Sequence, residues 1–264
     1  MARRIVITSG QGGVGKTSIV ANLGAKLSRA GNRVVVMDLD IGLNNLDVAC
    51  GVENKVLYDI IDVIEGRCRP AQALLEVEGY PNLWVMPSAH TLDKNYVNGQ
   101  NVRLVVEKLN GICDYILMDC PAGIELGFHR AVAAAEEAIV VTTPHISAVR
   151  DADRVIRLLK AYRLSSVSLV VNRARGDLML SGEMMEIADI NELLKTKIIG
   201  VIPEDDEMPL STAAGGMVSA CTQPDIAFNL LADNLLDGEG ELYDVTVKYR
   251  GFFGAIKRGL RRRV

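Results

Sequence analysis

The feature that most constrains the fold is a glycine-rich segment that joins an apolar run to a helical pattern. Residues 10–17 read Gly-Gln-Gly-Gly-Val-Gly-Lys-Thr and follow the apolar run Ile5-Val6-Ile7. This fits G-x-x-x-x-G-K-[ST], a phosphate-binding loop between a strand and a helix. Glycines at this spacing let successive backbone N–H groups surround a polyphosphate. A glycine-rich turn with an incidental lysine is the alternative. The apolar run before the loop and the helical pattern after it favour a nucleoside triphosphate site.

The residues of this loop have distinct expected roles. A helix predicted from Lys16 to Arg29 adds the positive end of its dipole to the phosphate site. Lys16 can reach the β- and γ-phosphates as a catalytic cation, and the Thr17 hydroxyl can ligate Mg²⁺. The remaining residues expected to contact the nucleotide are Gly12, Gly13, Val14, Gly15 and Ser18.

Apolar, β-branched runs alternate with helical patterns along the chain. Helical patterns occur at Val102–Leu109, Ala148–Tyr162 and Asp189–Leu194, among others. Continuous apolar strands separated by helices predict a doubly wound, mostly parallel α/β sheet with helices on both faces. The expected strands are Arg3–Thr8, Arg33–Asp38, Leu83–Pro87, Tyr115–Asp119, Ala138–Thr142, Val167–Asn172 and Ile198–Ile202.

Composition and length agree with one α/β core. The chain has 264 residues, of which 49% are hydrophobic, enough for a single large domain. Its five cysteines contain no C-x-x-C pair, so a reducing cytosol is expected rather than a disulfide or zinc framework. No run approaches the roughly 20 apolar residues that a membrane-spanning helix needs. We therefore expect an ATPase domain over residues 1–238 and a linker with a tail over residues 239–264.

Aspartates end two of the expected strands. Asp38 closes the second strand, Asp40 follows two residues later, and Asp119 closes the fourth. Ligands in parallel sheets bind at the carboxyl ends of the strands. Asp38 and Asp119 are therefore candidate Mg²⁺ partners, and Asp40 is a candidate for holding the attacking water. Each aspartate alone is an ordinary turn residue, but three beside a phosphate loop favour a site.

Four segments together resemble the MinD/ParA family of deviant Walker A ATPases, and within it the septum-positioning branch. The resemblance implies a homodimer in the ATP-bound form, with ATP and Mg²⁺ as cofactors, that binds membrane and is released after hydrolysis. It also implies that Asp40 positions water and that Asn172 reads adenine, with Arg173 beside it at the nucleotide. The segments are Ser9–Thr17, Asp38–Asp47, Asp119–Glu125 and Val201–Asp205.

A fifth segment, residues 147–154, resembles the helix start at which the family meets its partners. The resemblance implies that a Min-system protein (MinC, MinE or a topological specificity factor) binds near Arg150, Asp151 and Asp153. The same residues also suit a solvated helix capped by Ser147. Both interpretations remain open at this stage.

One residue departs from the family pattern. The family's signature lysine, which reaches the partner's γ-phosphate across the dimer, is Gln11 in this chain. A neutral amide donates hydrogen bonds but supplies no charge to the transition state. Related cationic groups are worth ~10³–10⁵ in rate. We therefore expect Gln11 to be a catalytic residue in an ATPase whose turnover is weakened. The alternative is an ATP-binding scaffold with little or no hydrolysis.

The chain closes with a basic amphipathic pattern. From Lys248 onward the chain carries seven Lys and Arg residues and no acidic residue, a charge of +7. Because the net charge of the whole chain is −4, the residues before Lys248 carry a net charge of −11. On a helix the apolar side chains would fall within about 120° of arc. Binding to nucleic acid would account for the arginines but not for the one-sided apolar side chains, and packing in the core would account for the apolar side chains but not for the arginines. Binding to an anionic membrane accounts for both. A partner groove remains an alternative. The stripe comprises Tyr249, Phe252, Phe253, Ile256, Leu260 and Val264.

Together these features predict a cytoplasmic ATPase that lies peripherally on the inner face of the cell membrane and helps place the division septum. No nucleic-acid partner is expected. A flagellar-number or cargo-positioning relative of the same family is the remaining alternative.

Overall fold

The computed structural model describes residues 1–42, 45–89 and 97–251. An eight-stranded sheet forms its centre, in the order β3-β4-β2-β5-β1-β6-β7-β8. Every strand pair is parallel except β3 with β4. The strands are β1 (Arg3–Thr8), β2 (Val34–Asp38), β3 (Leu75–Glu76), β4 (Leu83–Met86), β5 (Tyr115–Asp119), β6 (Glu137–Thr142), β7 (Ser166–Ala174) and β8 (Ile198–Pro203).

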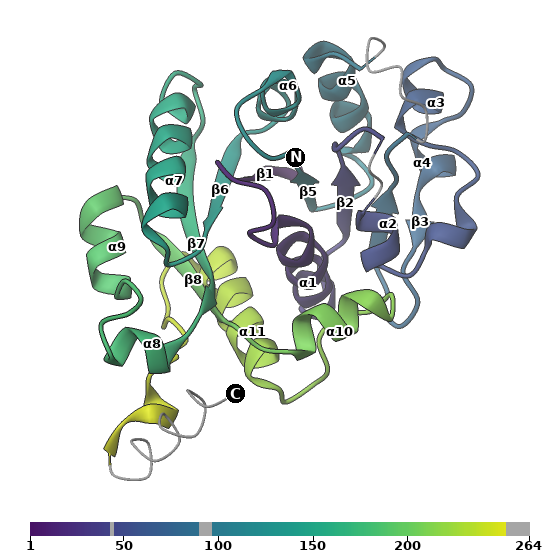
Figure 1. Cartoon of the computed structure of the whole chain (residues 1–264). Helices are drawn as coiled ribbons and strands as arrows, with labels where there is room; N and C mark the ends of the chain where they lie inside the picture. Colours follow the sequence, from purple (N-terminus) through teal and green to yellow (C-terminus); the bar gives the residue numbers. More distant parts are fainter. Residues whose placement is uncertain (43–44, 90–96, 252–264) are drawn as a thin grey trace.

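Helices cover both faces of the sheet, so the predicted doubly wound fold is confirmed. Figure 1 shows α5, α6 and α7 along one side of the sheet and α1, α10 and α11 along the other. The helices are α1 (Lys16–Arg29), α2 (Leu46–Ala49), α3 (Ile60–Ile64), α4 (Pro70–Ala73), α5 (Gly99–Leu109), α6 (Leu126–Ala133), α7 (Ile146–Leu159), α8 (Gly176–Leu180), α9 (Ile187–Leu194), α10 (Glu207–Ala213) and α11 (Gln223–Asp237), with 3-10 turns η1 (Glu53–Lys55) and η3 (Val247–Tyr249).

The two faces have separate hydrophobic cores because successive side chains of a strand point in opposite directions. In β1, Val6 packs with the α5–α7 side, whereas Ile5 and Ile7 pack with the α1 and α11 side. Strands that are buried on both faces read as the continuous apolar runs seen in the sequence. The seven predicted strands all form, with ends within two residues of those expected.

Helix α1 lies unusually close to the sheet. A Cβ added to Gly24 would lie 2.8 Å from Val36 Cγ1, a separation that a real side chain does not tolerate. Glycine therefore lets the helix that follows the phosphate loop pack directly on β2. This contact fixes the start of α1 relative to the strand ends that form the site.

The C-terminal segment beyond α11 is packed on the body. Val245 is buried with residues of α8 and β8, and the Lys248 ammonium donates a hydrogen bond to Gln223 Oε1 (2.6 Å) at the start of α11. Tyr249 is only 3% exposed. Residues 239–264 were expected as a linker and tail, and the described part of this segment contacts the α/β body through Val245, Lys248 and Tyr249. The proposed amphipathic helix lies mostly in residues 252–264, outside the described part of the chain.

Candidate functional site

The phosphate loop connects β1 to α1 as the sequence predicts. Gly13 and Gly15 have positive φ angles of 75° and 93°, a left-handed conformation that glycine adopts without steric cost. Gly15 is also the residue that precedes the first turn of α1, and it has no side chain to cap that turn. The first N–H groups of α1 are therefore available to an anion.

Lys16 lies in the loop with its ammonium held toward the strand. Its side chain is 9% exposed, and Nζ donates a hydrogen bond to Ser9 Oγ (3.1 Å). Ser9 in turn donates to the main-chain carbonyl of Gln11 (2.7 Å). Gln11 itself is an exposed residue.

The two strand-end aspartates are neighbours. Because β2 and β5 pair in parallel register, Asp38 lies directly opposite Asp119. Asp38 is 1% exposed and Asp119 is 3% exposed. Burial raises the pKa of Asp119 to about 7, with a further contribution from the Asp38 charge, and burial also raises the pKa of Asp38 to about 6. Two buried carboxylates at one strand edge create strong negative potential.

The two carboxyl groups differ in their hydrogen bonds. Asp38 accepts three main-chain N–H bonds, from Asp40 (2.9 Å), Asn45 (3.2 Å) and Leu46 (3.2 Å), and so shapes the turn after β2. Asp119 Oδ2 accepts from Thr17 Oγ1 (2.6 Å), while Oδ1 is buried with no hydrogen-bond partner among the described residues. An unsatisfied buried carboxylate oxygen is costly.

This donor set fits Mg²⁺. Magnesium prefers carboxylate, hydroxyl and phosphate oxygens and usually binds through one or two carboxylates. Thr17 and Asp119 are already paired, and Asp38 is adjacent, so the three residues predicted as metal partners are brought together. Asp40 follows directly and is partly buried, and its charge contributes to raising the pKa of both buried aspartates.

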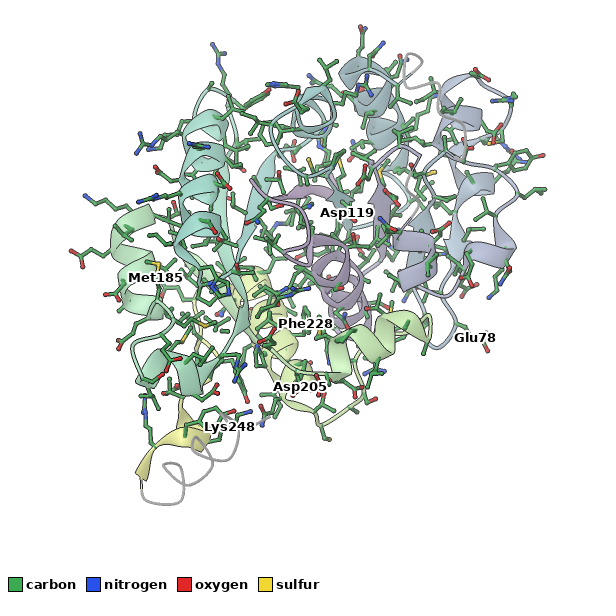
Figure 2. The ribbon with its side chains drawn as sticks, viewed as in Figure 1. Glu78, Asp119, Met185, Asp205, Phe228 and Lys248 are labelled. Carbon is green, nitrogen blue, oxygen red and sulfur yellow. The ribbon has the colours of Figure 1, made fainter. Side chains whose placement is uncertain are left out.

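A cavity of about 750 Å³ opens beside the first turn of α1. Asn172 Nδ2 donates to the carbonyl of Val14 (2.8 Å), and a Cβ on Gly15 would overlap that amide. Arg173, with a positive φ of 56°, lines the same cavity together with Ser18. In Figure 2, Asp205 lies below α1 and Asp119 above it, so this cavity extends away from the aspartate pair. Its size suits a base and ribose.

The far wall of this cavity was missed at the sequence level. None of the residues after β8 was among the nucleotide contacts expected from the sequence, yet three acidic residues at 204–206 line the cavity, and α10 forms much of the rest of the wall. The signal that could have found it is the position of this run just after an apolar strand. The wall consists of Pro203, Glu204, Asp205, Asp206, Met208, Pro209, Thr212 and Ala213.

The N-cap of helix α7 lies two residues before the expected cap, Ser147. His145 precedes the first helical residue, so the prediction that Ser147 caps the helix is wrong; Ser147 lies within the first turn. Asp151 and Asp153 pair with Arg154 (3.3 Å) and Arg157 (2.7 Å) along the exposed side of α7.

Helix α7 also contacts the phosphate loop. A Cβ on Gly10 would lie 2.5 Å from the main-chain oxygen of Asp151. Arg150 is exposed one residue earlier in α7. The predicted partner surface and the phosphate loop are therefore in direct contact through Gly10.

Tyr249 does not lie on a surface. It ends η3, which packs against α8, and the Lys248 ammonium lies 5.1 Å from the centre of its ring. The prediction that Tyr249 contacts lipid is therefore wrong, because the body of the domain buries the ring. The helix predicted from Lys248 is also interrupted, since Arg250 is extended with φ −80° and ψ 155°. The other predicted lipid contacts, Phe252, Phe253, Ile256 and Leu260, lie outside the described residues.

Within residues 1–42, 45–89 and 97–251, none of the helices has the length and apolar character needed to cross a bilayer.

The parallel sheet, the phosphate loop and the acidic pair define a P-loop nucleotide-binding protein. The family model described as "CobQ/CobB/MinD/ParA nucleotide binding domain" matches residues 5–216. The chain belongs to this MinD/ParA family, and its full-length relatives place it in the septum site-determining MinD branch of P-loop ATPases.

Two such relatives are septum site-determining proteins MinD. The Synechocystis protein is 43% identical over 263 residues, covering 98% of this chain and 99% of its own length. The Bacillus subtilis protein is 43% identical over 261 residues, covering 97% of each chain. These alignments cover nearly all of this chain, well beyond the nucleotide-binding core.

Solved structures agree. The Aquifex aeolicus MinC:MinD cell division protein complex contains a chain that is 39% identical, with a TM-score of 0.83 over 91% of this chain and 97% of that one. Pyrococcus horikoshii MinD complexed with Mg-ADP is 30% identical, with a TM-score of 0.81 over 90% of this chain and 98% of that one. The Pyrococcus horikoshii protein, whose structure holds Mg-ADP, thus shares the fold of this chain.

Proposed function

We propose that this chain is an ATP-driven switch that dimerises with ATP, binds the inner face of the membrane through its basic tail, and helps place the division septum. The observation that carries the proposal is the Thr17–Asp119 hydrogen bond beside the phosphate loop, with Asp38 adjacent and with no partner for Asp119 Oδ1 in the part of the chain that the structure describes. A magnesium triphosphate would supply a partner for Asp119 Oδ1.

The chain's own residues have separate tasks in this proposal. Lys16 leaves Ser9 to bind the β- and γ-phosphates, and the N–H groups of the loop surround them. Bound Mg²⁺ would neutralise phosphate charge, with Thr17 and Asp119 holding it. Asp40 orients the attacking water from the turn after β2. Asn172 and Arg173 contact the base and ribose in the cavity beside α1.

The tail supplies membrane affinity. Each large apolar side chain gives at most about 1.5–3 kcal/mol on full burial, and each basic residue adds about 1 kcal/mol near an anionic leaflet. The three glycines from Gly251 onward weaken a helix by roughly 1 kcal/mol each, so one tail binds weakly. Two tails on one dimer gain about 10²–10⁴ in avidity. ATP-dependent dimerisation thereby sets membrane residence.

Partner binding belongs to the same proposal. The solved Aquifex aeolicus complex contains MinC bound to MinD. We place a partner of the Min system near Arg150, Asp151 and Asp153 on α7. Contact between Gly10 and the α7 backbone gives such a partner a direct route to the phosphate loop.

A non-hydrolysing ATP scaffold is the second candidate, and Gln11 favours it. The exposed amide of Gln11 brings no positive charge to a partner's nucleotide. Replacing it by Gln11→Lys should raise turnover at least tenfold if the missing charge limits the reaction. An unchanged rate would mean that another group compensates.

The deciding experiment measures ATP turnover with and without anionic liposomes and sediments the same samples. ATP-dependent pelleting with turnover supports the switch, and ATP-dependent pelleting without turnover supports the scaffold. Deleting residues 252–264 should abolish pelleting while ATP binding is kept. The pair Phe252→Ser and Phe253→Ser keeps every tail charge, so it separates lipid insertion from charge attraction alone. Pelleting that survives the deletion would refute the tail mechanism.

A further inference from the structure

Ser9 connects three parts of the nucleotide site. It follows β1 directly and is 0% exposed. Its hydroxyl donates to the Gln11 carbonyl (2.7 Å) and accepts from Lys16 Nζ (3.1 Å). Its own carbonyl accepts from the N–H of Gly123 (3.1 Å), in the loop after β5. One buried residue therefore contacts the phosphate-binding lysine, the Gln11 position and the loop that follows Asp119.

The two side-chain bonds of Ser9 reinforce each other. A serine hydroxyl has one donor and two acceptor sites, and here the donor is used on Gln11 while an acceptor is used on Lys16. A hydrogen bond from an ammonium is stronger than a neutral one. It polarises the hydroxyl that it reaches, which strengthens the bond that this hydroxyl donates. The main chain of Gln11 is thus fixed through Ser9, while its side chain stays exposed.

A second contact limits how this loop can move. Gly10 lies between Ser9 and Gln11, and its Cα packs so closely on α7 that a Cβ would lie 2.5 Å from the Asp151 oxygen. With Gly10 held by α7, the Ser9 hydroxyl determines where the next peptide group points.

We propose that Ser9 is a positioning residue that ties the orientation of Gln11 to the state of Lys16. When Lys16 moves to the phosphates, the bond that Ser9 donates to Gln11 changes with it. The inference rests on the proposed function: the ATP-bound dimer would bring Gln11 to the partner copy's nucleotide, where its amide can donate a hydrogen bond but supplies no charge. Ser9 does not touch ATP itself, so its effect appears in turnover and dimerisation rather than in ATP affinity.

The test uses the full chain with Ser9→Ala. The dissociation constant for ATP, measured by equilibrium binding, should change less than about threefold because Lys16 keeps its phosphate contacts. Turnover at saturating ATP should fall about tenfold, and the ATP-dependent dimer should weaken by a similar factor, since one or two hydrogen bonds are lost. Ser9→Cys keeps the shape with a weaker donor and should give an intermediate effect.

Ser88→Ala is the matched control. Ser88 is a buried serine near the same edge of the sheet, and its hydroxyl has no hydrogen-bond partner among the described residues. This variant should keep wild-type turnover and dimerisation. An equal loss in Ser88→Ala would show that any buried serine matters here, and would overturn the proposal.

A double-mutant cycle tests the route through Gln11. In a Gln11→Ala background, Ser9→Ala should reduce turnover and dimerisation less than about twofold further, because there is no side chain at position 11 left to position. A full tenfold additional loss would overturn the proposal, as would a rise in the ATP dissociation constant that matches the fall in turnover. Wild-type protein that fails to bind ATP would instead refute the proposed function, so the two failures are distinguishable.

Discussion

Asp119 is expected to destabilise the metal-free protein, and removing its charge tests this. The carboxylate is buried opposite Asp38, and its Oδ1 has no partner among the described residues. Burial is the main reason that its pKa rises from 3.8 to about 7, and the Asp38 charge adds to the effect. Each unit of pKa shift corresponds to about 1.4 kcal/mol. Keeping Asp119 ionised in the folded state at pH 8 therefore costs on the order of 4 kcal/mol.

The variant Asp119→Asn has nearly the same shape and no charge. In EDTA at pH 8 we expect it to raise the free energy of unfolding by about 2–4 kcal/mol, part of the gain being lost to imperfect amide hydrogen bonds. At 2–4 °C per kcal/mol, the melting temperature should rise by roughly 4–16 °C. At pH 4 the wild-type carboxyl is protonated in the folded state, so the advantage should largely disappear. Wild-type stability contributed by this group is present at low pH and is lost as pH rises toward 7.

Thermal unfolding at pH 4 and pH 8, with EDTA and then with Mg-ATP, measures both the cost of the Asp119 charge without metal and the stabilisation that Mg-ATP provides. Mg-ATP should stabilise the wild type and do much less for Asp119→Asn, which lacks a metal ligand. Asp114→Asn is the matched control: Asp114 is exposed and paired with Arg33 (2.7 Å), which lowers the pKa of Asp114, so this variant should lose at most about 1 kcal/mol. An Asp119→Asn protein that is less stable than wild type at pH 8 would refute the reasoning.

Two further variants probe the packing around α1 and the loop. Gly10→Ala would place a Cβ 2.5 Å from the α7 backbone, so we expect ATP affinity to fall more than tenfold by titration, whereas Gly111→Ala, with open space around it, should bind normally. Lys26→Met leaves Asp225 as a buried unpaired charge between α1 and α11, and chemical denaturation should show a loss of about 3–5 kcal/mol. Arg157→Met breaks an exposed pair and should cost about 0.5 kcal/mol or less; equal losses would contradict the assigned burial.

The residues of the phosphate site could be placed from sequence because local patterns determine them. Strand β5 ends at Asp119 and strand β2 at Asp38, and parallel strands bring such ends to one edge. The glycines before Lys16 predict the left-handed backbone conformation that the loop adopts at Gly13 and Gly15. Periodicity and strand ends therefore sufficed for the fold class and for the neighbourhood of Thr17 and the aspartates.

The parts that sequence reasoning missed depend on distant contacts. The cavity wall in α10 is separated from Ser18 by most of the chain, and no local pattern links them. The short strand β3 pairs antiparallel at the sheet edge, against the parallel pattern elsewhere. Tyr249 has the spacing of a surface stripe, but only the tertiary structure reveals that the domain body buries it. Periodicity cannot distinguish a face buried by protein from one that would be buried by lipid.

The burial of Tyr249 changes how a nucleotide signal can reach the membrane. The Lys248 ammonium donates a hydrogen bond to Gln223, and in Figure 2 Lys248 lies below and to one side of Asp119. Gly251, the last residue that the structure describes, has a positive φ of 73°. Val245 packs against Gly176, the neighbour of Arg175, which lines the cavity beside α1. Nucleotide can therefore act on the tail in two ways, through this wall of the cavity or through the number of tails per particle. Under the proposed function the number of tails carries the signal, with one tail on a monomer and two on an ATP dimer. On this view, a covalently linked dimer should pellet with anionic liposomes even without ATP, and nucleotide dependence that survives the linkage would require a conformational signal instead.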